Sequence, residues 1–346
     1  MENQRVIAGV YRLIREIGAG RKGVVYLAEH LRLNKKVVLK ASKGTLSRKP
    51  EKNRREVDAL KDLNHARIPQ VYDFVEEDGM VYTVIEYIEG NSFEELLSGG
   101  CSFTQVEVAK WYRQLASALD TLHRKKICHR DIKPANIMLT PGGDACLIDF
   151  NSAQVKDSSE RFVSRSPGYA SPEQYEMYER LEDAARSRGK VTGYRNPQTV
   201  GGGQLTVNNE RWDDDKTELS FTLSPPSVID WVRSDIYNLG ATMYHILTGI
   251  RPKARAKEVV PLSKHDRFDP GLVRIIEKSM QPNPARRFAS APELSDALRR
   301  LKQRGKTNSI ILSPLATILV IATTSTFCAA TATIISTKLI NKRYYG

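Results

Sequence analysis

The stretch CHRDIKPANIMLTPGGDACLIDFNSA, residues 128–153, decides the fold and the chemistry of this 346-residue chain. It places Asp131, Lys133, Asn136 and Asp149 in a fixed order on a predicted loop and the hairpin that follows. Asp131 can orient a substrate hydroxyl toward a phosphate, and Lys133 can neutralise charge on the transferring group. Asn136 and Asp149 offer the hard oxygen atoms that Mg²⁺ prefers. The stretch therefore predicts phosphoryl transfer.

The segments before this stretch predict a small β-rich lobe. Residues 11–18, 23–31 and 35–41 are short, rich in β-branched and aromatic residues, and separated by Gly-rich or polar turns, which predicts three antiparallel strands. Residues 71–78 and 80–90 predict a further hairpin, and the apolar spacing over 53–63 predicts one helix.

A glycine pattern lies between the first two predicted strands. Gly18, Gly20 and Gly23 form GxGxxG, and their missing side chains would let backbone amides approach phosphate oxygens. Glycines at this spacing also mark ordinary tight turns, and a dinucleotide-binding fold requires the pattern to lead into a helix. Because a strand follows here, the pattern favours a lid over ATP.

Lys40 ends the apolar strand VVLK, so its stem can lie inside the lobe while its ammonium group reaches a phosphate. Glu56, on the predicted helix, is the candidate anionic partner. An ion pair between them would fix Lys40 against the α and β phosphates of ATP. For either residue alone, the alternative is an ordinary surface charge.

After Gly90 the pattern becomes helical. Residues 93–97 predict a short helix, and 104–126 predict a long one that opens with a capping box formed by Thr104 and Glu107. Two further helices are predicted around 235–247 and 292–302. The stretch 177–227 combines charge clusters, GGG and PP without an apolar period, and we predict a flexible insertion. It is either a partner-docking site or a plain disordered loop.

The last part of the chain predicts a membrane anchor. No charged residue stands between Lys306 and Lys338, and residues 310–337 exceed the roughly 20 apolar residues that span a bilayer. We predict a single C-terminal transmembrane helix, with a buried core helix as the alternative. A basic juxtamembrane linker (302–309) precedes it and a short tail (338–346) follows. The basic residues directly before the span are typical of its cytoplasmic end. We therefore predict that the globular part lies on the cytoplasmic face of a membrane.

Composition limits the partners. Lys and Arg outnumber Asp and Glu by 53 to 40, which suits an anionic membrane, acidic peptides or nucleic acid. No nucleic acid is expected, because stacking aromatics do not alternate with the basic residues. The four cysteines show no metal-ligand spacing. The first residues contain no apolar core of a signal peptide, so the N-terminal portion is expected in the cytosol.

HRDIKPAN, together with GAGRKGVV, VVLK, DFN and SPEQ, closely resembles the eukaryotic-type (bacterial-like) serine/threonine protein kinases. The resemblance covers residues 11–301 and implies an α+β, two-lobed fold. A small β-rich N-lobe with one helix (about 11–90) would precede a large, mainly helical C-lobe (about 91–301). The implied activity is transfer of the γ-phosphate of ATP, with Mg²⁺ or alternatively Mn²⁺, to protein Ser and Thr hydroxyls. Lys133 after HRD is the family's mark of this specificity.

The resemblance also assigns roles to residues. It implies catalytic roles for Asp131, Lys133, Lys40 and Glu56, and metal binding by Asn136 and Asp149. It implies ATP binding by Gly18, Ala19, Gly20, Gly23, Val25, Lys40, Glu86 and Ile88. Structural or regulatory roles are implied for His129, Arg130, Glu173, Asp235, Arg287 and Ser166. Among these, Asp235 would brace the catalytic loop and Arg287 would pair with Glu173.

One departure concerns the family's DFG triplet, which reads Asp149, Phe150 and Asn151 here. Asparagine tolerates left-handed backbone angles, so the turn can survive. We therefore predict an active, autophosphorylating enzyme in membrane-associated signalling, with a phosphate on residues 150–170 gripped by Arg130. The alternatives are a catalytically weak pseudokinase scaffold and a small-molecule phosphotransferase, which the peptide-docking SPEQ segment disfavours. Dimerisation is a further hypothesis.

Overall fold

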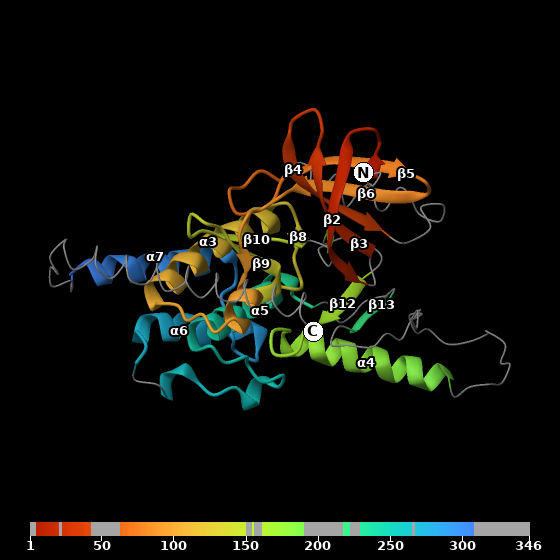
Figure 1. Ribbon diagram of the computed structural model, residues 1–346. Coiled ribbons are helices and arrows are strands. Elements are labelled where there is room, and N and C mark those ends of the chain that lie inside the picture. Colours follow the sequence, from red (N-terminus) through yellow and green to blue (C-terminus); the bar gives the residue numbers. More distant parts are fainter. Residues whose placement is uncertain are drawn as a thin grey trace, which may run out of the picture.

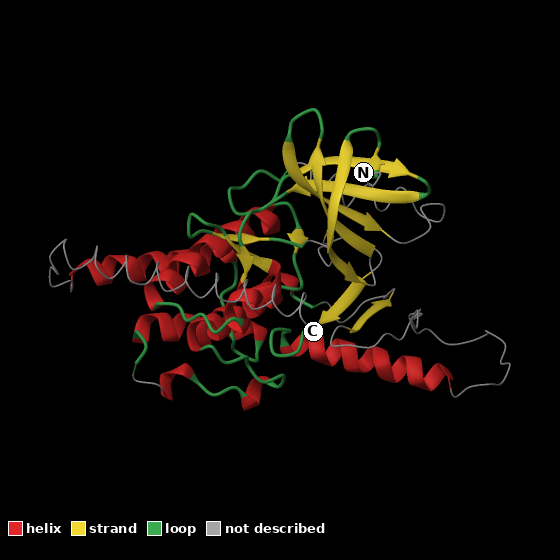
Figure 2. Ribbon diagram, in the orientation of Figure 1, coloured by secondary structure: helices red, strands yellow, loops and turns green. Residues whose placement is uncertain are grey.

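The computed structural model describes residues 5–20, 23–42, 63–149, 154–155, 161–189, 217–221, 229–264 and 267–307. It shows two lobes, with a β-sheet lobe above a mainly helical lobe (Figure 1). Figure 2 shows the same division, with strands gathered in the upper lobe and helices in the lower one. The predicted α+β, two-lobed architecture is confirmed for these residues.

A six-stranded antiparallel sheet forms the N-lobe. Its strands lie in the order β1-β2-β3-β4-β6-β5. Their bounds are β1 Val6–Ile7, β2 Tyr11–Gly20, β3 Gly23–His30, β4 Lys35–Ser42, β5 Val71–Glu77 and β6 Met80–Glu86. The three predicted strands and the later hairpin are thus confirmed, and β1 was not predicted. The predicted helix over 53–63 lies outside the described residues except for Leu63, which is not helical.

The side-chain alternation of β4 orients Lys40. Val37, Leu39 and Ala41 are buried in the N-lobe core with Tyr82 and other residues. Successive side chains of a strand point to opposite faces, so Lys40 lies on the other face of the sheet from this core. The strand pattern therefore delivers the lysine to the side that contacts Asp149.

Six helices form the described framework of the C-lobe: α2 Phe93–Ser98, α3 Gln105–Arg124, α4 Pro172–Gly189, α5 Trp231–Thr248, α6 Pro270–Ser279 and α7 Ala291–Thr307. The capping box of α3 is present, with the Thr104 N–H donating to Glu107 at 2.8 Å and the Glu107 N–H donating to Thr104 Oγ1 at 3.3 Å. The four predicted helices are confirmed as α2, α3, α5 and α7. The prediction missed α6, although Asp269 caps it and Pro270 opens it.

Short strands complete the C-lobe around the stretch that decides the fold. β7 (Asn91–Ser92), β9 (Ile137–Leu139) and β10 (Ala145–Leu147) form one small sheet, and β8 (Ile127–Cys128) pairs with β11 (Gln154–Val155). The loop that carries Asp131 therefore lies between β8 and β9. Asp149 follows β10, as the predicted hairpin requires.

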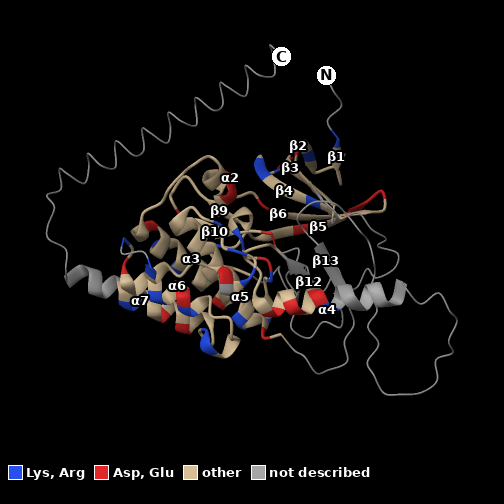
Figure 3. Cartoon of the chain, turned by 90° about the horizontal axis from the view of Figure 1, so that it is seen from below, with Lys and Arg blue, Asp and Glu red and all other residues tan. Residues whose placement is uncertain are grey.

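The stretch 177–227 contains regular structure where it is described. Helix α4 continues to Gly189, and β13 (Thr217–Phe221) pairs antiparallel with β12 (Arg161–Arg165). The absence of an apolar period misled the prediction here, because a helix rich in Glu, Arg and Ala forms from intrinsic propensity. Figure 3 shows acidic residues along the first part of α4.

The C-terminal predictions are only partly within the described residues. The basic linker predicted over 302–309 begins as the last turns of α7, which ends at Thr307. No helix in the described part of the chain is both long and apolar enough to cross a membrane. The predicted transmembrane segment, 310–337, lies outside that part.

Candidate active site

Asp235 joins helix α5 to the loop that carries Asp131. This aspartate is completely buried. Its Oδ1 accepts the backbone N–H of Arg130 at 2.7 Å, and its Oδ2 accepts the N–H of His129 at 2.8 Å. Arg130 has a left-handed backbone (φ 68°), a conformation that costs free energy and persists only where surrounding contacts hold it. The structure thus places Asp235 where the resemblance implied, beneath the loop.

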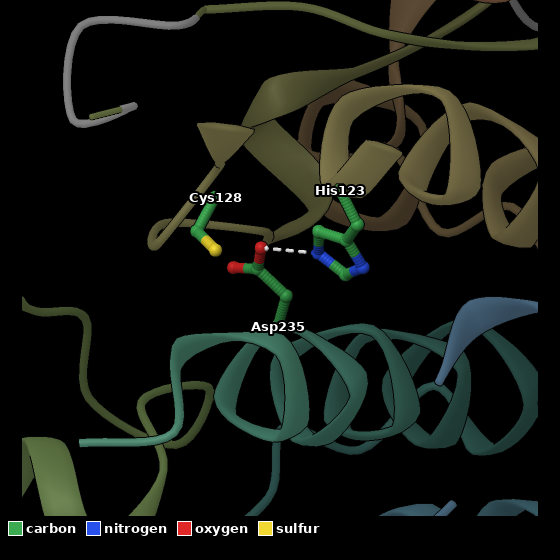
Figure 4. A group of neighbouring side chains, drawn as sticks. All are labelled: His123, Cys128 and Asp235. Carbon is green, nitrogen blue, oxygen red and sulfur yellow. Dashed lines mark hydrogen bonds and ion pairs between the residues drawn. The ribbon is translucent and has the colours of Figure 1, made fainter. Parts of the chain in front are cut away.

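His123 and Cys128 lie beside this carboxylate (Figure 4). His123 Nε2 lies 3.0 Å from Asp235 Oδ2, and the ligand-capable atoms of the three side chains lie within 4.8 Å of one another. Both oxygens of Asp235 already accept protein N–H groups. The group therefore acts as a hydrogen-bonded brace, and sequence spacing alone gave no sign of His123.

Three side chains hold Asp131. Ser166 Oγ donates to its Oδ1 at 2.6 Å, and Lys133 Nζ donates to its Oδ2 at 2.8 Å. Asn136 Nδ2 donates to the Asp131 carbonyl at 2.7 Å and to Oδ2 at 3.2 Å. Lys133 Nζ also donates to Ser166 Oγ at 3.0 Å. Four of the predicted residues therefore form one connected network.

Burial alone would raise the pKa of Asp131. The charge and hydrogen bond of Lys133, the hydroxyl of Ser166 and the charge of His129 outweigh it and lower this pKa from 3.8. The carboxylate consequently stays ionised near neutral pH and works as a hydrogen-bond acceptor.

Lys40 reaches Asp149 across the interface between the lobes. Lys40 Nζ lies 2.8 Å from Asp149 Oδ1, and Asp149 has a left-handed backbone (φ 65°). Glu56, Phe150 and Asn151 lie outside the described residues, so the Lys40–Glu56 pair and the effect of Asn151 stay predictions.

Asn136 and Asp149 suit a divalent cation. The backbone N–H of Ile148, next to Asp149, donates to the Asn136 carbonyl at 2.9 Å and ties the two segments together. The amide nitrogen of Asn136 faces Asp131, so its amide oxygen faces away from that carboxylate. A neutral amide oxygen and a carboxylate are hard ligands, the donor set expected for a cation that also binds phosphate oxygens.

The glycine pattern forms the turn between β2 and β3. Gly18 pairs with Val25, Ala19 with Val24, and Gly20 with Gly23. Gly23 has φ 141°, and a Cβ atom there would lie 1.7 Å from the Ala41 carbonyl oxygen, so only glycine fits. Val25 pairs in turn with Lys40 on β4. The predicted strand after the glycines is confirmed, and Gly23 at its start lies beside the lysine strand.

The connection between the lobes begins at Glu86, the last residue of β6. The Glu86 N–H donates to the Gln70 carbonyl at 2.8 Å, and the Gln70 N–H donates to Glu86 Oε2 at 3.2 Å. Ile88 is partly buried on the segment that follows. These bonds fix the start of the segment whose residues Glu86 and Ile88 the resemblance assigns to ATP binding.

Arg287 and Glu173 form the expected ion pair. Arg287 Nη1 and Nη2 lie 2.6 and 2.8 Å from the two oxygens of Glu173. Its remaining N–H groups donate to the carbonyls of Gln281, Arg233 and Pro282 at 2.7, 3.1 and 3.0 Å. All five guanidinium donors of this buried side chain thus have acceptors. The pair fixes the first turn of α4.

Gln174, next to Glu173, ends the SPEQ motif, but the sequence predicted no contact for its side chain. Its side chain is fully buried, and its Nε2 donates to the Arg130 carbonyl at 2.9 Å. Its Oε1 accepts from the Ser171 N–H at 2.8 Å and from Asn238 Nδ2 at 2.9 Å. Gln174 therefore connects α4 and α5 to the loop of Asp131.

Arg130 is buried, and its guanidinium lies 4.1 Å from the centroid of the Trp231 ring. This stacking was not predicted, because Trp231 is 101 positions away in the sequence. The proposal that Arg130 grips a phosphate on the 150–170 segment stays a prediction.

The segment after Ser166 rests on α5. Tyr169 Oη lies 2.7 Å from His245 Nδ1, and Asn238 Nδ2 donates to the Tyr169 carbonyl at 2.7 Å. Burial, and then the charge of Arg251, lower the pKa of His245 from 6.5 to about 4. His245 is therefore a neutral hydrogen-bond partner at neutral pH.

Comparison with known families agrees with this geometry. The family model described as protein kinase domain matches residues 11–184, about half of the chain. This chain belongs to the protein kinase family. Membership implies the use of ATP and a divalent metal ion in general, which the glycine turn, Lys40, Asn136 and Asp149 fit.

Curated bacterial proteins are similar to this kinase. Serine/threonine-protein kinase pkn3 of Myxococcus xanthus is 27% identical over 351 residues, covering 90% of this chain and 55% of the relative. PrkC of Bacillus subtilis is 34% identical over 175 residues, with 49% and 27% covered. PknD of Mycobacterium tuberculosis is 28% identical over 332 residues, with 90% and 43% covered. The kinase spans about half or less of the length of these relatives.

The first prediction concerns the Arg287–Glu173 pair. Replacing Arg287 by Ala leaves Glu173 and three carbonyls without their donors, so we expect the free energy of unfolding to fall by about 3–5 kcal/mol. Urea denaturation of the full chain measures this. Arg299→Ala is the matched control, because its pair with Asp296 is exposed and should contribute about 0–1 kcal/mol. Equal effects of the two variants would contradict the prediction.

The second prediction concerns His245. Its pKa is lowered in the folded state, so between pH 6.5 and about 4 the unfolded chain binds a proton that the folded chain does not. The free energy of unfolding should therefore decrease as the pH is lowered, and this residue should account for about 2 kcal/mol of the decrease between pH 7 and pH 5. His245→Gln, which does not titrate, should show a correspondingly smaller decrease in urea denaturation at the two pH values. Identical decreases would rule out His245 as the source.

Proposed function

We propose that this kinase transfers the γ-phosphate of ATP to Ser and Thr hydroxyls of proteins, with Mg²⁺, or Mn²⁺ in its place, as the metal ion. The observation that carries the proposal is the network around Asp131. Its carboxylate already accepts the hydroxyl of a serine, Ser166, at 2.6 Å. A substrate hydroxyl would make the same kind of hydrogen bond.

Asp131 has room for a substrate hydroxyl. A carboxylate offers about four lone-pair sites, and the described donors to its two oxygens are Ser166, Lys133 and Asn136. Its side chain is 12% exposed, so a substrate can approach from solvent. The lowered pKa keeps Asp131 ionised, and it orients the attacking oxygen and receives its proton late in transfer.

Lys133 and Lys40 supply positive charge on two sides of the reaction. Lys133 Nζ stays next to Asp131 and can neutralise charge on the transferring group. Lys40, on β4, would contact the phosphates that the glycine turn covers. A metal ion held by Asn136 and Asp149 would neutralise phosphate charge when bound. The ion pair of Lys40 with Asp149 brings the lysine into contact with this candidate metal ligand, which supports a common site for the phosphates and the metal ion.

A catalytically weak scaffold is the competing proposal. It is supported by Asn151 in place of the family's glycine, and the intact set of Lys40, Asp131, Asn136 and Asp149 supports the enzyme. Phosphate transfer by the wild-type chain would support the enzyme and contradict the scaffold.

The third prediction tests transfer. The full chain, incubated with labelled ATP, Mg²⁺ and a generic basic protein, should label that protein. Asp131→Asn should lower kcat by about 10²–10⁴-fold, because the variant can no longer receive the proton of the substrate hydroxyl. Nucleotide binding should change little, because Asp131 acts on the hydroxyl. Intact mass of both forms after Mg-ATP reports autophosphorylation in the same samples.

A wild-type chain that transfers no phosphate, with Asn151→Gly equally inactive, would favour the scaffold. A mass increase in the wild type that Asp131→Asn loses would support autophosphorylation. No mass increase in the wild type would contradict autophosphorylation. The labelling result would then decide by itself whether the chain transfers phosphate to other proteins.

We further propose that residues 310–337 anchor the kinase in a membrane, with the catalytic part on the cytoplasmic side. The absence of charge between Lys306 and Lys338 and the basic residues over 299–306 support this. Such an anchor would confine the kinase to substrates near the membrane, and it would raise the local concentration that dimerisation requires.

The fourth prediction tests the anchor. The full chain should stay with the membrane fraction after a wash at alkaline pH, because a spanning helix is not extracted by removing electrostatic contacts. A chain ending at Thr307 should appear in the supernatant. Extraction of the full chain by the wash would contradict a spanning segment.

A further inference from the structure

Arg251 and Pro252 follow α5 and lie directly against the segment after Ser166. Arg251 Nε donates to the Pro167 carbonyl at 3.0 Å. Gly168 has φ +82°, and a Cβ atom there would lie 2.3 Å from the Pro252 carbonyl oxygen and 3.4 Å from Arg251 Cγ. The two backbones thus touch at a position where only glycine fits.

Arg251 is anchored a second time by an aromatic ring. Its guanidinium lies 5.3 Å from the centroid of Tyr169, a distance typical of a cation–π contact. Tyr169 is itself fixed by its bonds to His245 and Asn238. Because Nε is used toward Pro167, the two terminal amino groups carry the other four N–H donors of this exposed side chain. The arginine is positioned in advance while its outer donors remain accessible to water.

The anchor lies close to the place of transfer. Pro167 directly follows Ser166, whose Oγ is 2.6 Å from Asp131 Oδ1. An extended peptide advances about 3.3 Å per residue, so a substrate residue that reaches Arg251 would lie about two to four positions from a hydroxyl seated at Asp131.

The local charge favours an anionic group. Lys253, two residues after Arg251, is also exposed. Burial, and then the charge of Glu94 of α2, raise the pKa of Tyr169, so Glu94 is an acidic group close enough to act on this ring. A planar, positioned guanidinium binds carboxylate or phosphate through two parallel hydrogen bonds.

We propose that Arg251 determines substrate specificity by binding a carboxylate or phosphate on the protein substrate, about two to four residues from the acceptor hydroxyl. The inference rests on the proposed function, since it requires a substrate hydroxyl at Asp131. It assigns to this kinase acidic or already phosphorylated segments as preferred substrates.

The experiment uses the full chain and labelled peptides with one serine and otherwise neutral residues. Glu, phosphothreonine, Gln or Lys is placed two, three or four positions before or after the serine. Binding is measured by fluorescence anisotropy in the presence of Mg-ADP, and kcat/KM by phosphate transfer. At the best position, Glu or phosphothreonine should improve both about five- to tenfold over Gln. A larger effect of phosphothreonine than of Glu would identify phosphate as the preferred group.

Charge reversal distinguishes recognition from a structural role. Arg251→Glu should remove the preference for Glu and create one for Lys, while Arg251→Lys should keep part of the original preference. Arg255→Glu is the matched control, because it makes the same charge change on a side chain that is 85% exposed and that, among the described residues, has no bond to the segment after Ser166. That control should keep the preference of the wild type.

Three results would overturn the inference. One is equal binding of Glu and Gln peptides by the wild type at every position. Another is an unchanged Glu-to-Gln ratio in Arg251→Glu with all rates lowered together, which would make Arg251 a structural clamp. The last is a preference lost equally in Arg255→Glu, which would reflect diffuse charge. A binding preference that depends on Arg251 without any transfer would instead support the inference and contradict the proposed function.

Discussion

The active site depends on one buried carboxylate, that of Asp235. Removing a carboxylate from water costs several kcal/mol, and the hydrogen bonds it accepts must offset that cost. Asp235 accepts the N–H groups of His129 and Arg130, and His123 Nε2 lies within hydrogen-bond distance. Since α5 is buried along most of its length, the carboxylate cannot move without disturbing the C-lobe core. The position of the loop is therefore set by the core of the lobe.

A second set of contacts holds the same loop from the side of α4. Two of the five hydrogen bonds of Arg287 fix Glu173, and the next residue, Gln174, donates to the Arg130 carbonyl. The peptide groups that flank Arg130 are thus bound at the amide by α5 and at the carbonyl by α4. This double attachment explains how a non-glycine residue keeps φ 68° there. Strain at Arg130 places the neighbouring Asp131 toward Ser166 and Lys133.

Local patterns predicted the elements well, because their causes lie within a few residues. The capping box at Thr104 and the alternation of Val37, Leu39 and Ala41 are of this kind. The motif residues Asp131, Lys133, Asn136 and Asp235 were also predictable, since their order along the chain matches a known family. Glu56 and Asn151 lie outside the described residues, so their roles stay predictions.

The rest of the site escaped prediction because its partners are distant along the chain. Gln174 meets Arg130 across 44 positions, and His123 meets Asp235 across 112. Neither side chain belongs to a short pattern that names its partner. The helix α4 escaped for another reason, since Glu, Arg and Ala sustain it by propensity without the apolar period that indicates burial.

The contacts of Ser166 join catalysis to substrate recognition. Its hydroxyl bonds Asp131 and Lys133, while the residues that follow it bond Arg251, His245 and Asn238. Because α5 supplies Asp235, Asn238 and His245, one helix positions both the carboxylate that orients the hydroxyl and the segment along which the substrate lies. A shift of α5 would move both together and preserve their spacing. Substrates are then selected by groups at the edge of this unit, where the anchored but exposed Arg251 lies.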